Sequence, residues 1–518
     1  MEVKIRNERE LLEWESRIGS VLRRHDLDYV LGGIRRSLDK LEPFTAAGIA
    51  LFAIRYSLPP IARGAKLYEM PWGELAPIAH LVIQYLIADP VSFEPAVEDD
   101  YRESTLIPII LRTVGNQFPY NVPFFGQYAR SLMLFHHIPQ RLSGHGNELG
   151  FDFDDSFQKL TGVSLVDFIT VGYGAFAAAN GSHGFTGGWF QKARHQGLRF
   201  DDEVVMKVLD QLAADQWQMR TLYERYRQPN RKYGMYDFNP LFVHPIVRPW
   251  PKREHTTLDE DRMIAPLPQL ILSRLSEGIY QQMFNHYRDD FSQHFGHLHE
   301  VYVGEVLRHS VPGKVLLSEH DIRRTYKKGK APDWAVIDGD TAILVESKAT
   351  GFQRKALATA DSGSIDRSVS QVIVGLTQLH EFRDACERRV AGLERFYGCS
   401  DFKLLVVTFE PFYIVNSVPF RAAVDGQLSK ELVTKGLSVQ PWYVLAVDQL
   451  EKLQPHIAAG IELEDVVEKL IGHQSFDSLL KELGDQTGRT YRDCFLYEMD
   501  VEIHKRLNIP IEDDEEDS

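Results

Sequence analysis

The chain has 518 residues, of which 44% are hydrophobic and 25% are charged, which is typical of a folded globular protein with more than one domain. Its formal net charge of −15 argues against a protein that coats nucleic acid indiscriminately, because an acidic body repels phosphate at long range. The three cysteines include no Cys-x-x-Cys pair, so neither a disulfide framework nor a cysteine zinc site is expected.

The start of the chain and its apolar runs bear on location. The first ten residues carry several charges and lack the apolar core of a signal peptide. Arg55 interrupts the apolar run Phe44–Leu58, and no run approaches the roughly 18 apolar residues that a membrane span needs. Together with cysteine usage typical of a reducing compartment, these features predict a cytoplasmic protein without a membrane partner.

Residues 1–228 carry mostly helical periodicity and predict a mainly α-helical N-terminal domain. Apolar residues recur at helical spacing in Leu11–Leu22, in Ala76–Ala88 and in Val204–Tyr226. No residue pattern in this domain indicates its role.

Two patterns in this region have simpler explanations than a ligand site. Gly172-Tyr-Gly174-Ala-Phe-Ala177 matches a dinucleotide-binding fingerprint, but its surroundings predict a helix without the preceding strand, so close helix packing is the preferred interpretation. His136 and His137 are adjacent, so on a helix their rings point to different faces and make a poor metal pair.

Seven prolines occur in residues 229–268, with asparagine, glycine and charged residues between them. Proline interrupts helices and central strands, so this segment is predicted to be a linker or extended arm between domains. A helix is predicted next, from Leu270 to Asp290, continuing toward the segment Phe295–Leu307.

Residues 330–349 predict a β-hairpin. Trp334–Ile337 and Ala342–Val345 are short apolar runs, and Asp338-Gly339 between them is a strong signal for a two-residue turn. An ordinary surface hairpin remains the alternative to a functional one.

The predicted turn determines which side chains share a face. It places Asp333 opposite Leu344, and side chains alternate along each strand. Asp333, Glu346 and Lys348 are therefore expected to project from the same side of the hairpin. Two like-charged carboxylates beside one amine make chemical sense chiefly as a site for a divalent cation.

The spacing Pro-Asp333, twelve residues, Glu346-Ser347-Lys348 resembles the active-site signature of the PD-(D/E)XK nuclease superfamily, which has the restriction-endonuclease-like fold. The resemblance implies that Asp333 and Glu346 hold Mg²⁺ or Mn²⁺, with the carbonyl of Ser347 as a further ligand. It also implies that Lys348 orients the attacking water or stabilises the transition state.

A second segment is similar to the leading helix of the same superfamily, in which Gly-x-x-Phe-Glu-x-Tyr-Val is a common form. Here the segment is Phe295-Gly-His-Leu-His299-Glu300-Val-Tyr-Val-Gly-Glu305-Val-Leu, with His299 in place of the usual aromatic residue. The resemblance implies that Glu300 helps to hold the metal, with Glu305 as the alternative.

Two further sets of residues are candidates for nucleic-acid binding. Five basic side chains crowd the stretch before Asp333 and are expected on a loop that guides a polyanion into the site; they are Arg323, Arg324, Lys327, Lys328 and Lys330. A helix is predicted over Ser368–Leu379, and its Gln371 is placed near the substrate by the resemblance.

Strands predicted at Lys403–Phe409 and Trp442–Val447 complete an α/β restriction-endonuclease-like core over residues 269–454, a central mixed sheet flanked by helices. Residues 455–510 are predicted to be a small helical C-terminal region. The acidic tail 511–518 cannot fold alone and is expected to be solvated, or to compete with nucleic acid for the basic stretch.

The sequence thus predicts a metal-dependent nuclease with DNA favoured over RNA, and antiviral defence against foreign DNA is a minority hypothesis. Two alternatives stay open: a catalytically silent nucleic-acid-binding or scaffold protein, and a nuclease subunit active only in a larger complex. The helical N-terminal domain would then recognise substrate or a partner protein, or mediate homo-oligomerisation.

Overall fold

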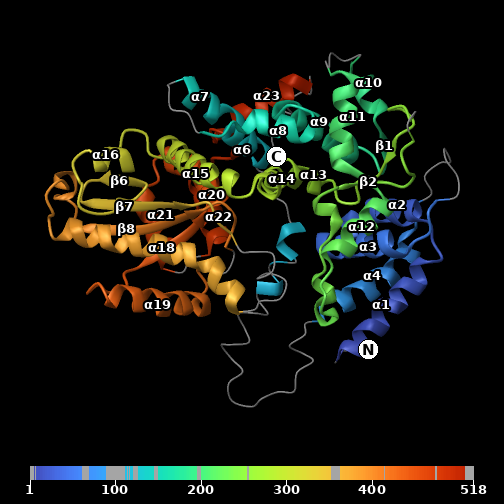
Figure 1. The fold of residues 1–518 in the computed structure, drawn as a ribbon, viewed down its shortest axis with the longest axis horizontal. Helices are drawn as coiled ribbons and strands as arrows, with labels where there is room; N and C mark the ends of the chain where they lie inside the picture. The colour runs from blue at the N-terminus through green and yellow to red at the C-terminus, as the bar shows by residue number, and fades with distance from the viewer. Residues whose placement is uncertain are drawn as a thin grey trace. The chain divides into compact units, whose positions relative to one another are not determined.

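The computed structural model describes most of the chain (Figure 1). The described residues are 5, 7–60, 69–88, 111–113, 115, 117–120, 126–144, 150–194, 200–253, 256–351, 362–412, 415–472 and 475–507. The chain forms two compact units, the first made of Met1–His137, Asp152–Arg288 and Glu498–Ser518 and the second of Ile138–Phe151 and Asp289–Tyr497. The predicted acidic tail lies outside the described residues.

The first unit is mainly helical, as the periodicity of the N-terminal region predicts. Its helices are α1 (Glu8–Leu22), α2 (Leu27–Arg36), η1 (Leu38–Lys40), α3 (Pro43–Tyr56), α4 (Trp72–Leu86), η3 (Phe118–Tyr120), α6 (Gln127–Leu132), η4 (Met133–His137), α8 (Phe153–Thr161), α9 (Leu165–Asn180), α10 (Gly188–Arg194), α11 (Asp202–Leu212), α12 (Gln216–Tyr226), η5 (Arg231–Tyr236), η6 (Pro240–Phe242), α13 (Gln269–Arg274), α14 (Glu277–Tyr287) and α23 (Tyr497–Leu507). Two short strand pairs join them: β1 (Phe185–Thr186) with β4 (Arg262–Met263), antiparallel, and β2 (Ala213–Asp215) with β3 (Ile246–Arg248), parallel.

A buried polar network ties the helices of this unit together. Glu15 of α1 forms ion pairs with Arg55 of α3 and with Arg231 of η5, and Arg231 also pairs with the almost fully buried Asp237 at 2.9 Å. The Arg55 guanidinium lies 4.3 Å from the ring centroid of Tyr223. Each charge has an opposite partner, so the network satisfies groups whose burial would otherwise be costly.

The proline-rich segment 229–268 belongs to the first unit, in contrast to the predicted linker between domains. Its strand β3 lies between Pro245 and Pro249, where proline leaves the ladder intact. Arg248 at the end of β3 is buried and pairs with Asp261 at 2.9 Å. Local composition suggested a linker, whereas pairing with distant β2 holds the segment in a core.

Two helices of the first unit that the sequence predicts as continuous are interrupted in the structure. The predicted helix Val204–Tyr226 divides into α11 and α12, because Ala213–Asp215 adopts an extended conformation and pairs with β3. Asp215 then caps α12 by accepting the N–H of Gln218. The predicted helix Leu270–Asp290 is broken into α13 and α14, and it is separated from the next helix at Arg288, whose φ is +51°.

The second unit is built around a sheet with helices on both faces (Figure 1). Its elements are α7 (Ile138–Gly144), α15 (Asp289–Ser310), β5 (Val315–Ser318), α16 (Glu319–Arg323), β6 (Trp334–Asp338), β7 (Thr341–Lys348), α18 (Ser362–Glu387), η7 (Glu394–Phe396), β8 (Asp401–Thr408), α19 (Val418–Val433), β9 (Trp442–Ala446), α20 (Val447–Ala458), α21 (Leu463–Ile471), α22 (Phe476–Thr487) and η8 (Tyr491–Asp493). Residues 455–497, predicted to form a separate helical region, are part of this unit.

The five strands have the order β5-β6-β7-β8-β9. The pairs β5–β6 and β6–β7 are antiparallel, while β7–β8 and β8–β9 are parallel. The sheet is therefore mixed, and the prediction of an α/β chain with a mixed sheet and a large helical region is confirmed. The strand β5 was not predicted.

The hairpin turn lies one residue later than predicted. Asp338 pairs with Thr341, so Gly339 and Asp340 form the loop, and Gly339 takes the positive φ of +58°. Continued by one residue, this register places Asp333 opposite Glu346 rather than Leu344. The shift along the partner strand is two residues, so every side chain keeps the face that was predicted for it.

Helices α15 and α18 cover opposite faces of this sheet. A Cβ at Gly304 of α15 would meet Trp334, whose partner across the hairpin is Val345. A Cβ at Gly375 of α18 would meet the side chain of Glu346, the next residue along β7. Neighbouring residues of a strand point to opposite faces, so the two helices lie on opposite sides.

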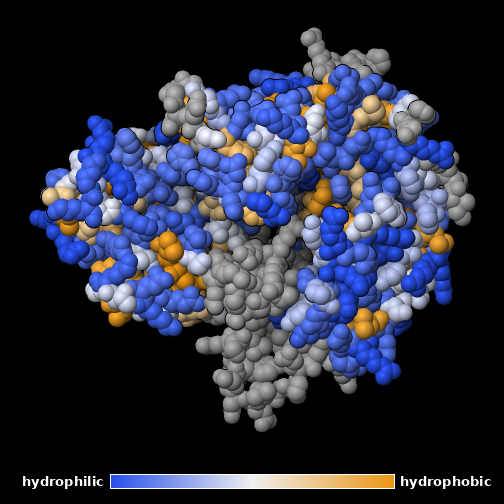
Figure 2. Space-filling view, in the orientation of Figure 1, coloured by the Kyte–Doolittle hydropathy of each residue, from blue (hydrophilic) through white to orange (hydrophobic). Residues whose placement is uncertain are grey.

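The face seen in Figure 2 is mostly hydrophilic, with exposed hydrophobic side chains scattered over the described residues. Of the helices that the structure describes, none is by itself long and apolar enough to cross a bilayer, although the bent pair α8 and α9 passes that test by length and composition.

Candidate metal centre

Three carboxylates converge in the second unit. One oxygen from each of Glu300, Glu319 and Asp333 lies within 4.8 Å of the others. They come from three separate elements: α15, the first turn of α16, and the residue before β6. Two of them, Glu300 and Asp333, were predicted metal ligands, and the structure brings these two together.

Local structure explains why Glu319 and Asp333 meet. Ser318, the last residue of β5, pairs with Trp334, the first residue of β6. Glu319 follows Ser318 and Asp333 precedes Trp334, so these two acids are neighbours. The backbone N–H of Glu319 donates to the carbonyl of Asp333 at 2.8 Å. Ser318 also caps α16 in a capping box with Asp321, which sets the direction in which the helix leaves the strand.

Asp333 is held beside Glu346 by a bond across the hairpin. The backbone N–H of Ser347 donates to Asp333 Oδ2 at 2.6 Å. Burial raises the pKa of Asp333 to about 8, and the negative charges of Glu346 and Glu300 add to this effect. The carboxylates therefore repel one another as long as no cation lies between them.

Glu346 is the most deeply buried acid of this group, with 2% of its surface exposed. Its Oε1 accepts from Lys348 Nζ at 2.7 Å, whereas its Oε2 is buried and has no hydrogen-bond partner among the described residues. Burial raises the pKa of Glu346, although the ammonium group of Lys348 opposes this. An unpartnered buried carboxylate oxygen is costly, and a cation ligand position would satisfy it.

Lys348 contacts both Glu346 and the helix α18. Its Nζ is 3.5 Å from Gln378 Oε1 of that helix. A Cβ at Gly375 would stand 3.1 Å from Lys348 Cε and 3.2 Å from Glu346 Cγ, so a glycine here makes room for both side chains against α18. Of the predicted catalytic residues, Asp333, Glu346 and Lys348 thus share one face and make one site with Glu300.

Other predicted residues lie elsewhere. Glu305, the alternative to Glu300, points away from the cluster, because it pairs with Arg141 at 2.9 Å and with Arg308. Nearby His309, 3.6 Å away, and Arg141 lower the pKa of Glu305 to about 2. Glu305 is therefore a structural ion-pair residue.

A glutamine of α18 other than Gln371 contacts the candidate site. Gln371 lies on α18 as predicted, but its side chain is exposed and forms no hydrogen bond within the described residues. Gln378, two turns further along the same helix, is the glutamine that reaches Lys348. The carbonyl of Ser347 as a metal ligand stays a prediction, since the contact seen for Ser347 is the one from its N–H.

The basic stretch is only partly a loop. Arg323 belongs to α16 and pairs with Glu319, an acid of the cluster, while its side chain stays 43% exposed. Arg324, Lys327, Lys328 and Lys330 lie after the helix and are exposed, as a loop requires.

Glu319 is the site residue that sequence reasoning missed. Its position depends on β5, a four-residue strand whose first residue, Val315, is half exposed and gives only a weak apolar pattern. The available signal was the capping box Ser318-Glu319-His320-Asp321, which marks a helix start directly before the basic stretch.

The patterns set aside in the N-terminal region are structural. Gly172 and Gly174 lie inside helix α9, where a Cβ would collide with Leu275 and Phe190 respectively. His136 and His137 have separate acidic partners, Asp154 at 2.7 Å and Glu502 at 3.2 Å. Close helix packing, the preferred interpretation of the glycines, is confirmed.

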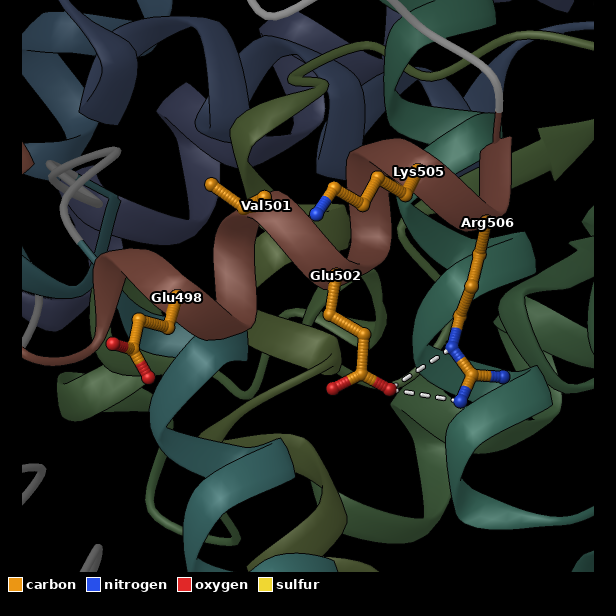
Figure 3. Close-up of a pocket in the computed structure, with 5 residues that line it drawn as sticks. All are labelled: Glu498, Val501, Glu502, Lys505 and Arg506. Carbon is orange, nitrogen blue, oxygen red and sulfur yellow. Dashed lines mark hydrogen bonds and ion pairs between the residues drawn. The ribbon is translucent and has the colours of Figure 1, made fainter.

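A surface groove of about 420 Å³ lies along α23 in the first unit (Figure 3). Its lining residues are Glu498, Val501, Glu502, Lys505 and Arg506. Glu502 and Arg506 neutralise each other through hydrogen bonds of 2.8 and 3.1 Å. The groove contains none of the predicted site residues, and its mixed, self-paired charges favour no ligand class.

The acids, the lysine and the glutamine of the second unit therefore form the candidate site: Glu300, Glu319, Asp333, Glu346, Lys348 and Gln378.

No family model, no curated protein and no solved structure matches the chain significantly.

Proposed function

We propose that this chain is a divalent-metal-dependent nuclease that hydrolyses phosphodiester bonds of nucleic acid, with DNA favoured. The observation that carries the proposal is the convergence of the Glu300, Glu319 and Asp333 carboxylates beside a buried Glu346 that is paired with Lys348. Four acids and one amine gathered at one end of the β6–β7 hairpin destabilise the fold, because the carboxylates repel one another and are partly buried. A bound cation would offset this loss of stability.

The donor set fits Mg²⁺ or Mn²⁺. All candidate ligands are carboxylate oxygens, which hard divalent cations prefer, and the unpartnered Oε2 of Glu346 offers a ligand position that no other group satisfies. Asp333, Glu346, Glu300 and Glu319 would hold the ion. When bound, the cation supplies Lewis-acid chemistry, which neutralises charge on a phosphate and makes water easier to deprotonate.

The protein's own groups would provide the rest of the chemistry. The Nζ of Lys348, half-buried and 2.7 Å from Glu346, would stabilise the negative charge that develops on a scissile phosphate. Gln378 accepts a hydrogen bond from the same lysine at 3.5 Å and would help to position it. Ser347 orients Asp333 through its N–H.

The order of elements supports a restriction-endonuclease-like fold for the second unit. The helix α15 carries Glu300, the β6–β7 hairpin carries Asp333, Glu346 and Lys348, and α18 with β8 follows. This order is the one that the resemblance to the PD-(D/E)XK nucleases implies, and fold analogy supports a reaction class without naming a substrate.

A cleavage assay tests the proposal. Purified chain would be incubated with linear, circular and single-stranded DNA and with RNA, in Mg²⁺, Mn²⁺ or EDTA. We expect cleavage that requires metal and that is lost in the double variant Glu346→Ala, Lys348→Ala. The matched control is Asp401→Ala, Lys403→Ala, which removes an acid and a lysine at the same spacing on β8 of the same sheet, paired at 2.8 Å.

Calorimetric titration of Mn²⁺ separates the alternatives. Binding by wild type but not by the Glu346 and Lys348 variant, without cleavage of any substrate, would favour a subunit that needs a partner. The absence of Mn²⁺ binding in both proteins, with no cleavage, would contradict the proposal and favour a catalytically silent nucleic-acid-binding protein.

A further inference from the structure

We propose that two basic segments, distant in sequence, form one surface that binds the phosphate backbone of nucleic acid and leads it to the candidate metal centre. The first segment carries Arg324, Lys327, Lys328 and Lys330, and the second carries Arg389 and Arg395; together they are called the basic track. The identity of the ligand rests on the proposed function, while the existence of an anion-binding surface does not.

Contacts between the two segments place them side by side. Thr325 Oγ1 donates to the carbonyl of Gly392 at 2.7 Å. The ring of Tyr326 lies 5.7 Å from that of Phe382 in an edge-to-face arrangement, which fixes the first segment against the last turns of α18. Gly392 permits this approach, because its φ is +96° and a Cβ there would stand 2.4 Å from the Thr325 carbonyl oxygen.

The track is positive although the chain as a whole is strongly acidic. All six side chains are exposed, and none forms an ion pair within the part of the chain that the structure describes. Neighbouring acids are mostly engaged: Asp384 pairs with Arg388, and Glu387 pairs with Arg383. Asp321 interacts with Arg324, and Glu394 accepts the N–H of Gly392, so they offset only part of the charge.

Arg389 supplies an independent reason to expect a ligand. It follows the last residues of α18 with a φ of +54°, and the bonds Arg389 N–H to Cys386 and Val390 N–H to Ala385 close the helix end. Glycine is the usual residue at such a left-handed helix end, because a side chain there is strained. Tyr397 holds the conformation by donating to the Arg389 carbonyl at 3.0 Å. The chain thus keeps a charged side chain where glycine would be easier.

The position of the track favours a polyanion of regular charge. Lys330 stands three residues before Asp333, so one end of the track adjoins the carboxylate cluster. The other end, at 389–395, is on the segment that connects α18 to β8. Cations spread along such a path match the repeated phosphates of a nucleic-acid strand, and neutralising each phosphate releases counterions.

Binding is measured without cleavage, by fluorescence anisotropy of the full chain in EDTA with a labelled 20-base-pair duplex and a labelled 20-nucleotide single strand. Two variants each remove two charges, Lys327→Ala with Lys328→Ala, and Arg389→Gly with Arg395→Ala. The control Lys430→Ala with Lys481→Ala removes two exposed lysines of α19 and α22 in the same unit.

We expect each track variant to weaken binding by roughly tenfold near 0.1 M salt and to reduce the slope of log K against log salt by about 1.5 to 2. The control should leave both quantities unchanged. Arg389→Gly should not lower the melting temperature, since glycine tolerates the positive φ, and this separates loss of binding from loss of folding.

Two results would contradict the proposal that the basic track binds nucleic acid. One is an unchanged affinity and salt slope in both track variants, and the other is the absence of binding by wild type at low salt. Cleavage that persists with unchanged binding in the variants would refute the track alone. Binding through the track with neither Mn²⁺ binding nor cleavage of any substrate would refute the nuclease and leave the anion-binding surface supported.

Discussion

Trp334 donates its indole N–H to the backbone carbonyl of Glu300 at 2.9 Å, and this bond joins helix α15 to the first residue of β6. Glu300 is one acid of the cluster, and Asp333, the residue before Trp334, is another. The indole therefore fixes the distance between two elements on which the site depends. Gly304, one turn further along α15, lets the ring approach, because a Cβ there would stand 2.0 Å from Trp334 Cζ2.

Gly304→Ala is expected to lower the free energy of unfolding by about 1 to 3 kcal/mol, because the methyl group forces the indole or the helix to move. Gly296→Ala on the same helix is the matched control, since nothing lies within 4 Å of its Cβ position. There alanine should stabilise the helix by up to about 1 kcal/mol. Urea unfolding of both variants measures the difference, and equal effects would contradict the role of Gly304.

Local signals predicted the hairpin well. The alternation of side chains and the Asp338-Gly339 pair led to the correct face for Asp333, Glu346 and Lys348. The turn was placed one residue early because glycine takes the first loop position, where φ is positive. That error changed the partner of Asp333 without changing its face.

Features set by long-range pairing could not be predicted in this way. Glu319 reaches the cluster only because β5 pairs with β6, and β5 is short and half exposed. The proline-rich segment is held in the first unit by the pairing of β2 with β3, 30 or so residues apart, which local composition does not record. The resemblance alone indicates Gln371, and only the helix geometry reveals that Gln378 contacts Lys348.

Lys348→Ala should lower cleavage by at least about 100-fold while leaving Mn²⁺ affinity nearly unchanged, because the lysine contacts Glu346 and is not itself a ligand. Gln378→Ala, which frees the lysine from one side, should reduce the cleavage rate by about tenfold. Gln371→Ala on the same helix is the control and should cleave like wild type. If the two glutamine variants behave alike, Gln378 does not position Lys348.

Glu319→Gln should weaken Mn²⁺ binding by roughly 10- to 100-fold, since it removes one charge from the cluster while keeping the shape of the side chain. Glu305→Gln removes a carboxylate that is paired with Arg141 and Arg308 instead. It should retain Mn²⁺ affinity and lose some thermal stability. Isothermal titration of Mn²⁺ decides the matter, and an unchanged affinity in Glu319→Gln would exclude that residue from the metal centre.

Asp500 in α23 should make stability depend on pH independently of the metal centre. Burial raises its pKa to about 7, and its Oδ1 has no hydrogen-bond partner among the described residues. A carboxyl whose pKa is raised by folding favours the folded state at low pH, and this advantage is lost as the pH rises from about 4 through 7. Between pH 5 and pH 8.5, Asp500→Asn should therefore lose less stability than wild type, by on the order of 2 kcal/mol. Parallel pH profiles of the two proteins would contradict this.

Asp333 should produce a second pH dependence, one that a divalent cation removes. Its pKa is raised to about 8 by burial and by the charges of Glu346 and Glu300, so the metal-free protein loses stability as the pH rises from about 4 through 8. Mg²⁺ or Mn²⁺ binds the ionised carboxylates of the folded state, so it should stabilise the protein more at pH 8.5 than at pH 5.

The experiment is thermal unfolding in EDTA and in Mn²⁺ across this pH range, carried out in the Asp500→Asn background so that the contribution of Asp500 is removed. Asp333→Asn in that background should reduce the pH dependence of the metal-free profile, leaving the part due to Glu346, and abolish the stabilisation by Mn²⁺. Stabilisation by Mn²⁺ that is equal at pH 5 and pH 8.5, or that survives in Asp333→Asn, would mean that the cation binds elsewhere. The carboxylate cluster would then be a strained feature of the fold with no role in holding metal.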